Sequence, residues 1–452
     1  MAETTCSPSV VLAPASPSIT RGLSLRANFS WTFVGNSLYS ACQWGALVAL
    51  AKLSSPVIVG QYALGMAIAT PVSSLTGLQM RPVIASDVKQ TYKFGEYLGF
   101  RLASTALATL IILAIPLILH SGPMMTMLTF VIGLALGIES ISDIYYARLQ
   151  YIDRMDRIAK SQILRAPLSL MALCFGVYFT GKLTWAVALM AVVRAAVLLG
   201  YDRRVQTHSC EPLDANSPAS LLDFEYLKQT LRPRWELRKM GRILWLALPL
   251  GIVAMLVSLN GTMPRYFIQW KLGTRELGIY SALAFLMSAG NLLVTALAQA
   301  VFVPLARYYA EGRRRAFTFL LLKLMGIGTV LGAGGILVAW IAGPKLLVLI
   351  YRPEYAAESR LLVWFMVVAW IGYLGQFMGG AMTSARLFTR QIPLFALGVL
   401  SITVGSYLLV PRMGLQGAIV ASIVGLTIQL AVSAALLAYS LANLREEAIS
   451  LA

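Results

Sequence analysis

Long apolar runs dominate the chain, and their number and length fix most of what it can fold into. A run of about 20 residues can cross the hydrocarbon core of a membrane as a helix, because each helical residue rises about 1.5 Å. One long polar interruption, at 205–241, divides the runs six and six. The sequence predicts twelve spans at residues 30–51, 57–79, 97–119, 123–146, 163–180, 183–203, 243–263, 277–304, 317–342, 361–384, 393–410 and 414–439.

The composition agrees with a membrane protein and excludes an ordinary soluble one. Charged residues make up 12% of the chain and hydrophobic residues 58%, whereas about a quarter of a soluble protein is charged. The 37 basic residues outnumber the 19 acidic ones, but they lie in short clusters between apolar runs. That placement favours membrane anchoring over a nucleic-acid partner. The cysteines and histidines show no ligand spacing, so we expect no metal, no cofactor and no catalytic residue.

The basic residues also orient the spans. With the N-terminus in the cytoplasm, the cytoplasmic loops and tails hold about three times as many Lys and Arg residues as the opposite loops, which is the bias of the positive-inside rule. Both termini are therefore expected in the cytoplasm. The expected organisation is a disordered tail (1–28), a six-helix lobe (29–204), a cytoplasmic linker (205–241), a second six-helix lobe (242–440) and a cytoplasmic tail (441–452).

The two halves carry traces of an internal repeat. AKLSSPVIVGQYAL follows the first span and WKLGTRELGIYSAL follows the seventh, so that Gly60-x-Tyr62 matches Gly278-x-Tyr280. Because six is even, the halves would be parallel repeats about an axis normal to the membrane. The predicted fold is an all-α polytopic membrane protein with two six-helix lobes.

Several stretches resemble the Wzx-type flippases of the multidrug/oligosaccharidyl-lipid/polysaccharide exporter superfamily. They are ARLQYIDRMDRIAKSQILRAPLSL (147–170), MPRYFIQWKLGTRELGIYSALAFL (263–286), YRPEYAAESRLL (351–362) and VPRMGLQGAIVAS (410–422). The resemblance implies a MATE-like fold in the bacterial inner membrane, with the two lobes around a central cavity. It implies a substrate, an undecaprenyl-diphosphate-linked oligosaccharide, moved from the cytoplasmic to the periplasmic leaflet for O-antigen (lipopolysaccharide), capsule or exopolysaccharide synthesis. A polysaccharide polymerase and export machinery would be its partners.

The chemistry of such a substrate fits the chain independently. A diphosphate head cannot cross hydrocarbon alone, so a carrier needs a cavity with cationic and hydrogen-bonding groups between two lobes that rock. That task requires no covalent step, so we expect the protein not to be an enzyme. No G-x-x-x-x-G-K-[ST] loop is present, so ATP is not expected as the direct energy source.

Two carboxylates and one arginine stand out because they fall inside spans. Glu139 and Asp143 are four residues apart and share a helix face. By helical rise, Glu139 lies about 13 Å above Arg148 and Arg194 about 13 Å above Arg203, at matched depth. Two interpretations stay open: a structural ion pair, or an Arg194 that meets the diphosphate while Glu139 positions it or takes up a proton. Asp143, a second coupling candidate, is expected to pair with Arg148 or Arg101.

Further candidate substrate contacts lie in both halves. Arg265 falls beside Asn260 and a kinking Pro264 near the outer end of the seventh span. In proteins of the resembled fold the first helix of each lobe lines the cavity, which implies sugar contacts. Hydrogen bonding between helices is the alternative role of those polar side chains. The remaining candidates are Asn36, Tyr39 and Gln43 in the first span, and Arg148 and Arg386 below the fourth and tenth spans.

Three other function classes fit the sequence less well. A purely structural membrane protein would not need two repeated six-helix halves with buried charge. A cation-coupled multidrug or metabolite exporter of the same fold predicts an acidic, aromatic cavity, whereas arginine is the abundant charge here. A membrane polymerase or glycosyltransferase needs a large extracytoplasmic loop, and every predicted outer loop is short. The sequence therefore favours a flippase.

Overall fold

The computed structural model describes residues 25–86, 92–151, 154–208, 232–385 and 387–450, and these parts contain helices and no strand. The first half contains α1 (Leu25–Leu53), α2 (Pro56–Gly77), α3 (Met80–Ser86), α4 (Phe94–Ile118), α5 (Pro123–Tyr151), α6 (Met155–Thr180), α7 (Leu183–Val197), the π-helical turn η1 (Leu198–Asp202) and α8 (Arg203–His208). The second half contains α10 (Leu237–Lys271), α11 (Thr274–Leu286), α12 (Ser288–Ala310), α13 (Arg314–Ile350), α14 (Pro353–Ala356), α15 (Ser359–Ser384), α16 (Phe388–Met413) and α17 (Leu415–Ser450).

The predicted spans are confirmed as helices. Eleven helical stretches in the described residues are long and apolar enough to cross a membrane. The twelfth, α1, has 29 residues but falls short in hydropathy because its sequence mixes Asn, Ser, Tyr and Gln with apolar residues. The predicted span 277–304 is broken at Met287, between α11 and α12.

The structure changes some of the predicted boundaries. The first helix begins at Leu25, inside the predicted N-terminal tail, and α17 continues to Ser450 through most of the predicted C-terminal tail. Residues 1–24 of the N-terminal tail and 209–231 of the linker lie outside the described residues.

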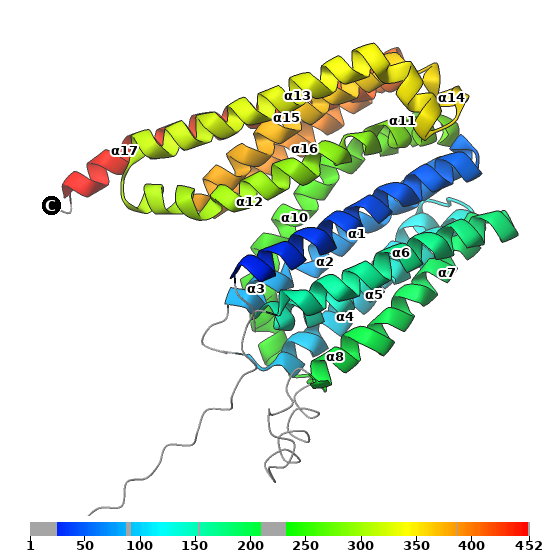
Figure 1. Ribbon diagram of the computed structural model, residues 1–452, viewed down its shortest axis with the longest axis horizontal. Helices are drawn as coiled ribbons and strands as arrows, with labels where there is room; N and C mark the ends of the chain where they lie inside the picture. The colour runs from blue at the N-terminus through cyan, green and yellow to red at the C-terminus, as the bar shows by residue number, and fades with distance from the viewer. Residues whose placement is uncertain (1–24, 87–91, 152–153, 209–231, 386, 451–452) are drawn as a thin grey trace, which may run out of the picture.

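The helices form two lobes with the same internal packing (Figure 1). In the N lobe (α1–α8), α1 packs on α6, α6 on α7, α4 on α5 and α5 on α7. In the C lobe (α10–α17), α10 packs on α16, α16 on α17, α13 on α15 and α15 on α17. Each pair in one lobe thus has its counterpart in the other, as a repeat of six helices requires.

The lobes join most fully at one end of the molecule. After the predicted orientation we call this the outer end; it holds the turns between α1 and α2, α6 and α7, and α10 and α11. The opposite end, with the arginine-rich and lysine-rich starts of α6, α10 and α13, is called the basic end. The largest buried apolar cluster crosses both lobes here, from Leu50 and Val59 to Leu277 and Tyr355. Toward the basic end the apolar core divides into separate clusters. The protein is therefore closed at its outer end.

Small residues make the outer closure tight. A Cβ on Gly60 would lie 1.9 Å from the carbonyl oxygen of Thr274, and one on Gly278 would lie 1.8 Å from that of Pro56. The Arg352 guanidinium donates two further hydrogen bonds, of 3.1 and 2.9 Å, to the carbonyl oxygen of Lys52. The two glycines matched in the internal repeat therefore meet the opposite lobe in symmetric positions.

The two lobes meet along a boundary, and on one side of this boundary they stay in contact from end to end. From the outer to the basic end, α10 runs beside α2, and Lys239 near its start bonds Glu96 of α4 at 2.7 Å. On the other side, α1 and α12 line the division between the lobes (Figure 1) and make few contacts. The side between α1 and α12 is thus where the lobes can part toward the basic end.

Candidate functional site

A charged cluster lies at the centre of the N lobe, where α5, α6 and α7 meet. Glu139 of α5 accepts a 2.8 Å hydrogen bond from Nη1 of Arg194 in α7. Nη2 of Arg165 in α6 lies 3.7 Å from the other carboxylate oxygen. The side chains of Arg194 and Arg165 are only 8% and 4% exposed, while that of Glu139 is 24% exposed. Two buried cations therefore share one carboxylate, which leaves a net positive charge.

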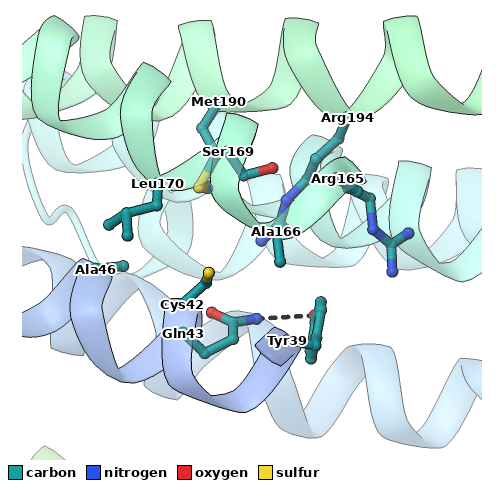
Figure 2. Close-up of a pocket in the computed structure, with 10 residues that line it drawn as sticks. All are labelled: Tyr39, Cys42, Gln43, Ala46, Arg165, Ala166, Ser169, Leu170, Met190 and Arg194. Atoms are coloured by element: carbon teal, nitrogen blue, oxygen red, sulfur yellow. Dashed lines mark hydrogen bonds between the residues drawn. The ribbon is translucent and has the colours of Figure 1, made fainter. Parts of the chain in front are cut away.

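Two side chains of α1 complete this cluster. Tyr39 donates its hydroxyl to Oε1 of Glu139 and accepts a 2.8 Å hydrogen bond from Nε2 of Gln43, the dashed bond in Figure 2. The Arg165 guanidinium lies over the rings of Tyr39 and Tyr146, 5.6 and 5.5 Å from their centroids. The helix next to the parting side is thus tied to the cluster through polar contacts.

The space around the cluster is small in this state. A cavity of about 20 Å³ is lined by residues of α1, α6 and α7, among them Tyr39, Gln43, Arg165 and Arg194 (Figure 2). A second, also of about 20 Å³, lies against Tyr62 of α2 and shares Gln43 and Arg194. Each holds about one water molecule, so any larger ligand could reach the arginines only after movement of α1.

Arg165 has unmet hydrogen-bonding capacity. Its Nε and Nη1 are buried without a hydrogen-bond partner, and buried donors in that condition are uncommon because desolvation without a partner costs about 1–3 kcal/mol. Two of the guanidinium's nitrogens are therefore available to an anion that enters the cluster.

Sequence reasoning found Glu139 and Arg194 and missed the role of Arg165. Matched depth from helical rise brought the first two together, and the contact between them is confirmed. The predicted span began at residue 163, which put Arg165 at the membrane boundary, but α6 begins at Met155. Arg165 therefore lies about ten residues, or roughly 15 Å, into the helix. The sequence from Met155 to Gln162 contains no Pro or Gly, so it could have been read as the start of the same helix.

Asp143 belongs to a second group nearer the basic end. It lies 3.6 Å from Nη1 of Arg81 and 3.9 Å from Nη2 of Arg101, so the expected Arg101 contact is present. Arg101 also donates to the carbonyl oxygen of Gly77 at 3.0 Å, and Arg148 stacks over the ring of Phe94 at 5.2 Å. These contacts join α3, α4 and α5, which suits a structural group.

The C-lobe candidates lie apart from the cluster. Asn260 donates to Oε1 of Gln429 at 3.0 Å and so joins α10 to α17. Nε of Arg265 is buried without a hydrogen-bond partner, and among the described residues no carboxylate lies within ion-pair distance of this arginine. Asn36 is exposed on α1, and Arg386 lies outside the described residues. Within those residues, no group of three or more metal-ligating side chains occurs.

Comparisons with known proteins identify the family and the fold. Residues 25–307 match the family described as polysaccharide biosynthesis protein. The capsular polysaccharide biosynthesis protein CapF of Staphylococcus aureus is 23% identical over 412 residues, which cover 91% of this chain and 97% of CapF.

Solved structures agree on the fold. A multidrug resistance MATE family transporter of the MOP superfamily, in an inward-facing conformation, superposes with a TM-score of 0.65 at 14% identity, over 94% of this chain and 96% of that one. An outward-facing conformation of such a transporter gives 0.59 at 13% identity, over 92% and 95%. The chain therefore belongs to the polysaccharide biosynthesis protein family and has the two-lobed membrane fold of MATE transporters.

Proposed function

We propose that the protein is a flippase that moves undecaprenyl-diphosphate-linked oligosaccharide from the cytoplasmic to the periplasmic leaflet of the bacterial inner membrane. Family membership supports a role in polysaccharide biosynthesis, and the fold is one used by transporters. The positive-inside bias supports an orientation with both termini and the basic end in the cytoplasm.

The central charged cluster is the observation that carries this proposal. Arg165 and Arg194 face a single carboxylate, and two nitrogens of Arg165 lack partners. A diphosphate presents several anionic oxygens, which guanidinium groups bind through paired, charge-assisted hydrogen bonds. An exporter of cations would need a surplus of carboxylates over basic groups at this position. Asn36, Tyr39 and Gln43 of α1 then serve as hydrogen-bonding contacts to the sugar, and Arg265 as a later contact in the C lobe.

The mechanism is alternating access. In the state described, the outer end is closed, and the head group enters between α1 and α12 from the basic end while its polyprenyl tail stays in the bilayer. The diphosphate takes Arg165 and Arg194 from Glu139, which takes up a proton once it loses its cationic partners. The lobes then close at the basic end and open at the outer end. There Glu139 gives up its proton to water, and the return of the arginines to its carboxylate releases the head group.

Transport in proteoliposomes tests the proposal directly. Purified protein is reconstituted with undecaprenyl-diphosphate-linked oligosaccharide, and exposure of the glycan on the opposite leaflet is followed over time. We expect Arg165→Ala and Arg194→Ala each to slow transport at least about tenfold, because each loses charge-assisted hydrogen bonds of about 1.5–3 kcal/mol. Arg315→Ala, an exposed site at the basic end of α13, is the matched control and should transport normally.

Binding separates substrate contact from a structural ion pair. If the arginines meet the diphosphate, the lipid-linked glycan should raise the unfolding temperature of wild type and of Arg315→Ala, and not that of Arg165→Ala. A well-folded wild type that leaves the glycan in place and expels a cationic drug would overturn the proposal.

A further inference from the structure

A second basic site lies away from the transport cluster, at the basic end of α6. A cavity of about 370 Å³ opens between the start of α6 and the η1–α8 segment. Four basic side chains and one acidic side chain line it: Arg154, Arg157, Lys160, Arg204 and Asp156. Neither the charged cluster nor the outer closure uses any of them.

Local contacts shape this basic cavity. Asp156 is held by Arg154 through two hydrogen bonds, of 2.9 and 3.0 Å, so the one carboxylate is already neutralised. Nη1 of Arg157 donates to the carbonyl oxygen of Val205 at 3.3 Å and ties α6 to α8. Nζ of Lys160 lies 5.6 Å from the centroid of the Trp31 ring on α1. The remaining charge in the cavity is positive.

The N-terminus of α6 adds to that charge. This helix has 26 residues, and the amide groups of its first turn together with its dipole attract an anion at this end. The cavity, the basic side chains and the helix end therefore favour the same kind of ligand, a phosphate group.

Apolar surface leads from the cavity toward the outer end. On α6, side chains 36–57% exposed recur at helical spacing above Lys160, at Leu164, Leu168, Met171 and Phe175. On α7, side chains 36–63% exposed recur at Trp185, Leu189 and Val192, and Leu199 of η1, 59% exposed, continues this surface. The two helices pack together. A ligand with a phosphate head in the cavity would thus have acyl chains beside it along both helices.

We propose that this cavity binds the head group of an anionic phospholipid of the cytoplasmic leaflet, with its chains along α6 and α7. Basic pockets between membrane helices on the cytoplasmic side suit such head groups. Tyr201, which also lines the cavity, and Trp31 are residue types that settle at the membrane interface. The lipid would hold the N lobe at a fixed depth beside the moving helix α1.

Native mass spectrometry tests the site on the full-length protein. Wild type, taken from an equimolar mixture of phosphatidylglycerol and phosphatidylcholine, should retain phosphatidylglycerol selectively. The double variant Lys160→Gln/Arg204→Gln should retain it about 30-fold more weakly, as expected for two basic groups near an anionic head. The control, Arg313→Gln/Arg315→Gln, removes the same charge at the basic end of α13 and should bind like wild type.

Several results would overturn the proposal. They are equal retention of both lipids by wild type, equal losses in the two double variants, displacement of phosphatidylglycerol by excess inorganic phosphate, and preferential uptake of undecaprenyl diphosphate at this cavity. The lipid mixture and the phosphate competition use wild type alone, so they decide the question even if the Lys160→Gln/Arg204→Gln variant fails to fold.

Discussion

At the residue scale, the three charges of the central cluster are not equivalent. Glu139 is the only anion of the three, and its carboxylate oxygens lie 2.8 Å from Nη1 of Arg194 and 3.7 Å from Nη2 of Arg165. Removing one arginine leaves a neutral pair, whereas removing the carboxylate leaves two buried cations facing each other. Breaking a buried pair is costly mainly because of the charge left behind.

We therefore expect Glu139→Gln to lower the free energy of unfolding by roughly 3 kcal/mol, and Arg194→Gln by only about 1 kcal/mol. Unfolding in detergent micelles, followed by heat or denaturant, measures both. Glu311→Gln removes a carboxylate from the exposed pairs with Arg307 and Arg313 and should leave stability nearly unchanged, because solvent screens exposed ion pairs. Equal losses in Arg194→Gln and Glu139→Gln would contradict the shared-carboxylate arrangement.

A buried tyrosine at the outer end gives a pH-dependent prediction. Burial raises the pKa of Tyr355 from its ordinary 10.0 to about 12, and its hydroxyl is buried without a hydrogen-bond partner. Because the folded pKa is raised, the neutral phenol supports folding below pH 10, and this support is lost as the pH rises from 10 to 12.

Tyr355→Phe should therefore give a shallower loss of stability over that pH window, measured by thermal unfolding. Its stability at neutral pH should equal or exceed that of wild type, since the ring still packs against Tyr351 at 5.2 Å between centroids. A marked loss at neutral pH would show that the hydroxyl has a partner.

At the scale of elements, the crossing of α2 and α11 controls the outer closure. Gly60 and Gly278 each meet a backbone carbonyl of the other helix, and a backbone group cannot move aside as a flexible side chain can. A methyl group at either position must separate the helices, so the closed outer end loses stability relative to the open one.

Gly60→Ala and Gly278→Ala should both shift the protein toward an outer-open state without substrate. Spin labels are placed at Lys182→Cys and Glu354→Cys, which lie exposed at the outer ends of the N and C lobes, in a parent chain whose native cysteines have been replaced. The distance between the labels should be longer in each glycine variant than in this parent. Gly334→Ala in α13 meets open space and should leave the distance unchanged. An unchanged distance in Gly60→Ala would remove this crossing from the mechanism.

The elements were largely predictable and the contacts between lobes were not. Hydropathy predicts membrane helices well because lipid offers no hydrogen-bond partner to backbone amide and carbonyl groups. An apolar segment that crosses the membrane therefore forms a helix, which pairs these groups within itself. Helical rise predicted the Glu139–Arg194 pair because it compares depths within one lobe. The break at Met287 has no Pro or Gly at that position, and the repeat identified Gly60 and Gly278 without showing that they meet opposite lobes. Those features depend on how the lobes pack.

At the scale of the whole molecule, the apolar core is one cluster across both lobes at the outer end. Toward the basic end it separates into a C-lobe cluster and an N-lobe cluster, and only α10 joins the second cluster from the C lobe. A rocking motion must exchange these conditions, so the two ends should move in opposite senses. This is the geometric requirement of alternating access.

Two label pairs test that exchange. On addition of the lipid-linked glycan, the outer pair at 182 and 354 should move apart, while a basic-end pair at Arg203→Cys and Arg315→Cys should approach. Electron–electron double resonance in nanodiscs measures both distances. Changes of the same sign at the two ends would exclude rocking of the lobes.

In the described residues, three helices of the C lobe are longer than any helix of the N lobe, whose longest, α1 and α5, have 29 residues each. In the C lobe, α10, α13 and α17 have 35, 37 and 36 residues, or roughly 52–56 Å each. In the N lobe, α2, α4 and α6 have 22, 25 and 26 residues, or roughly 33–39 Å, close to the hydrocarbon thickness of about 30 Å. A helix longer than the hydrocarbon is accommodated by tilting or by local thickening of the bilayer. We therefore expect membrane thickness to act on the C lobe more than on the N lobe, and so to become a variable in the conformational equilibrium.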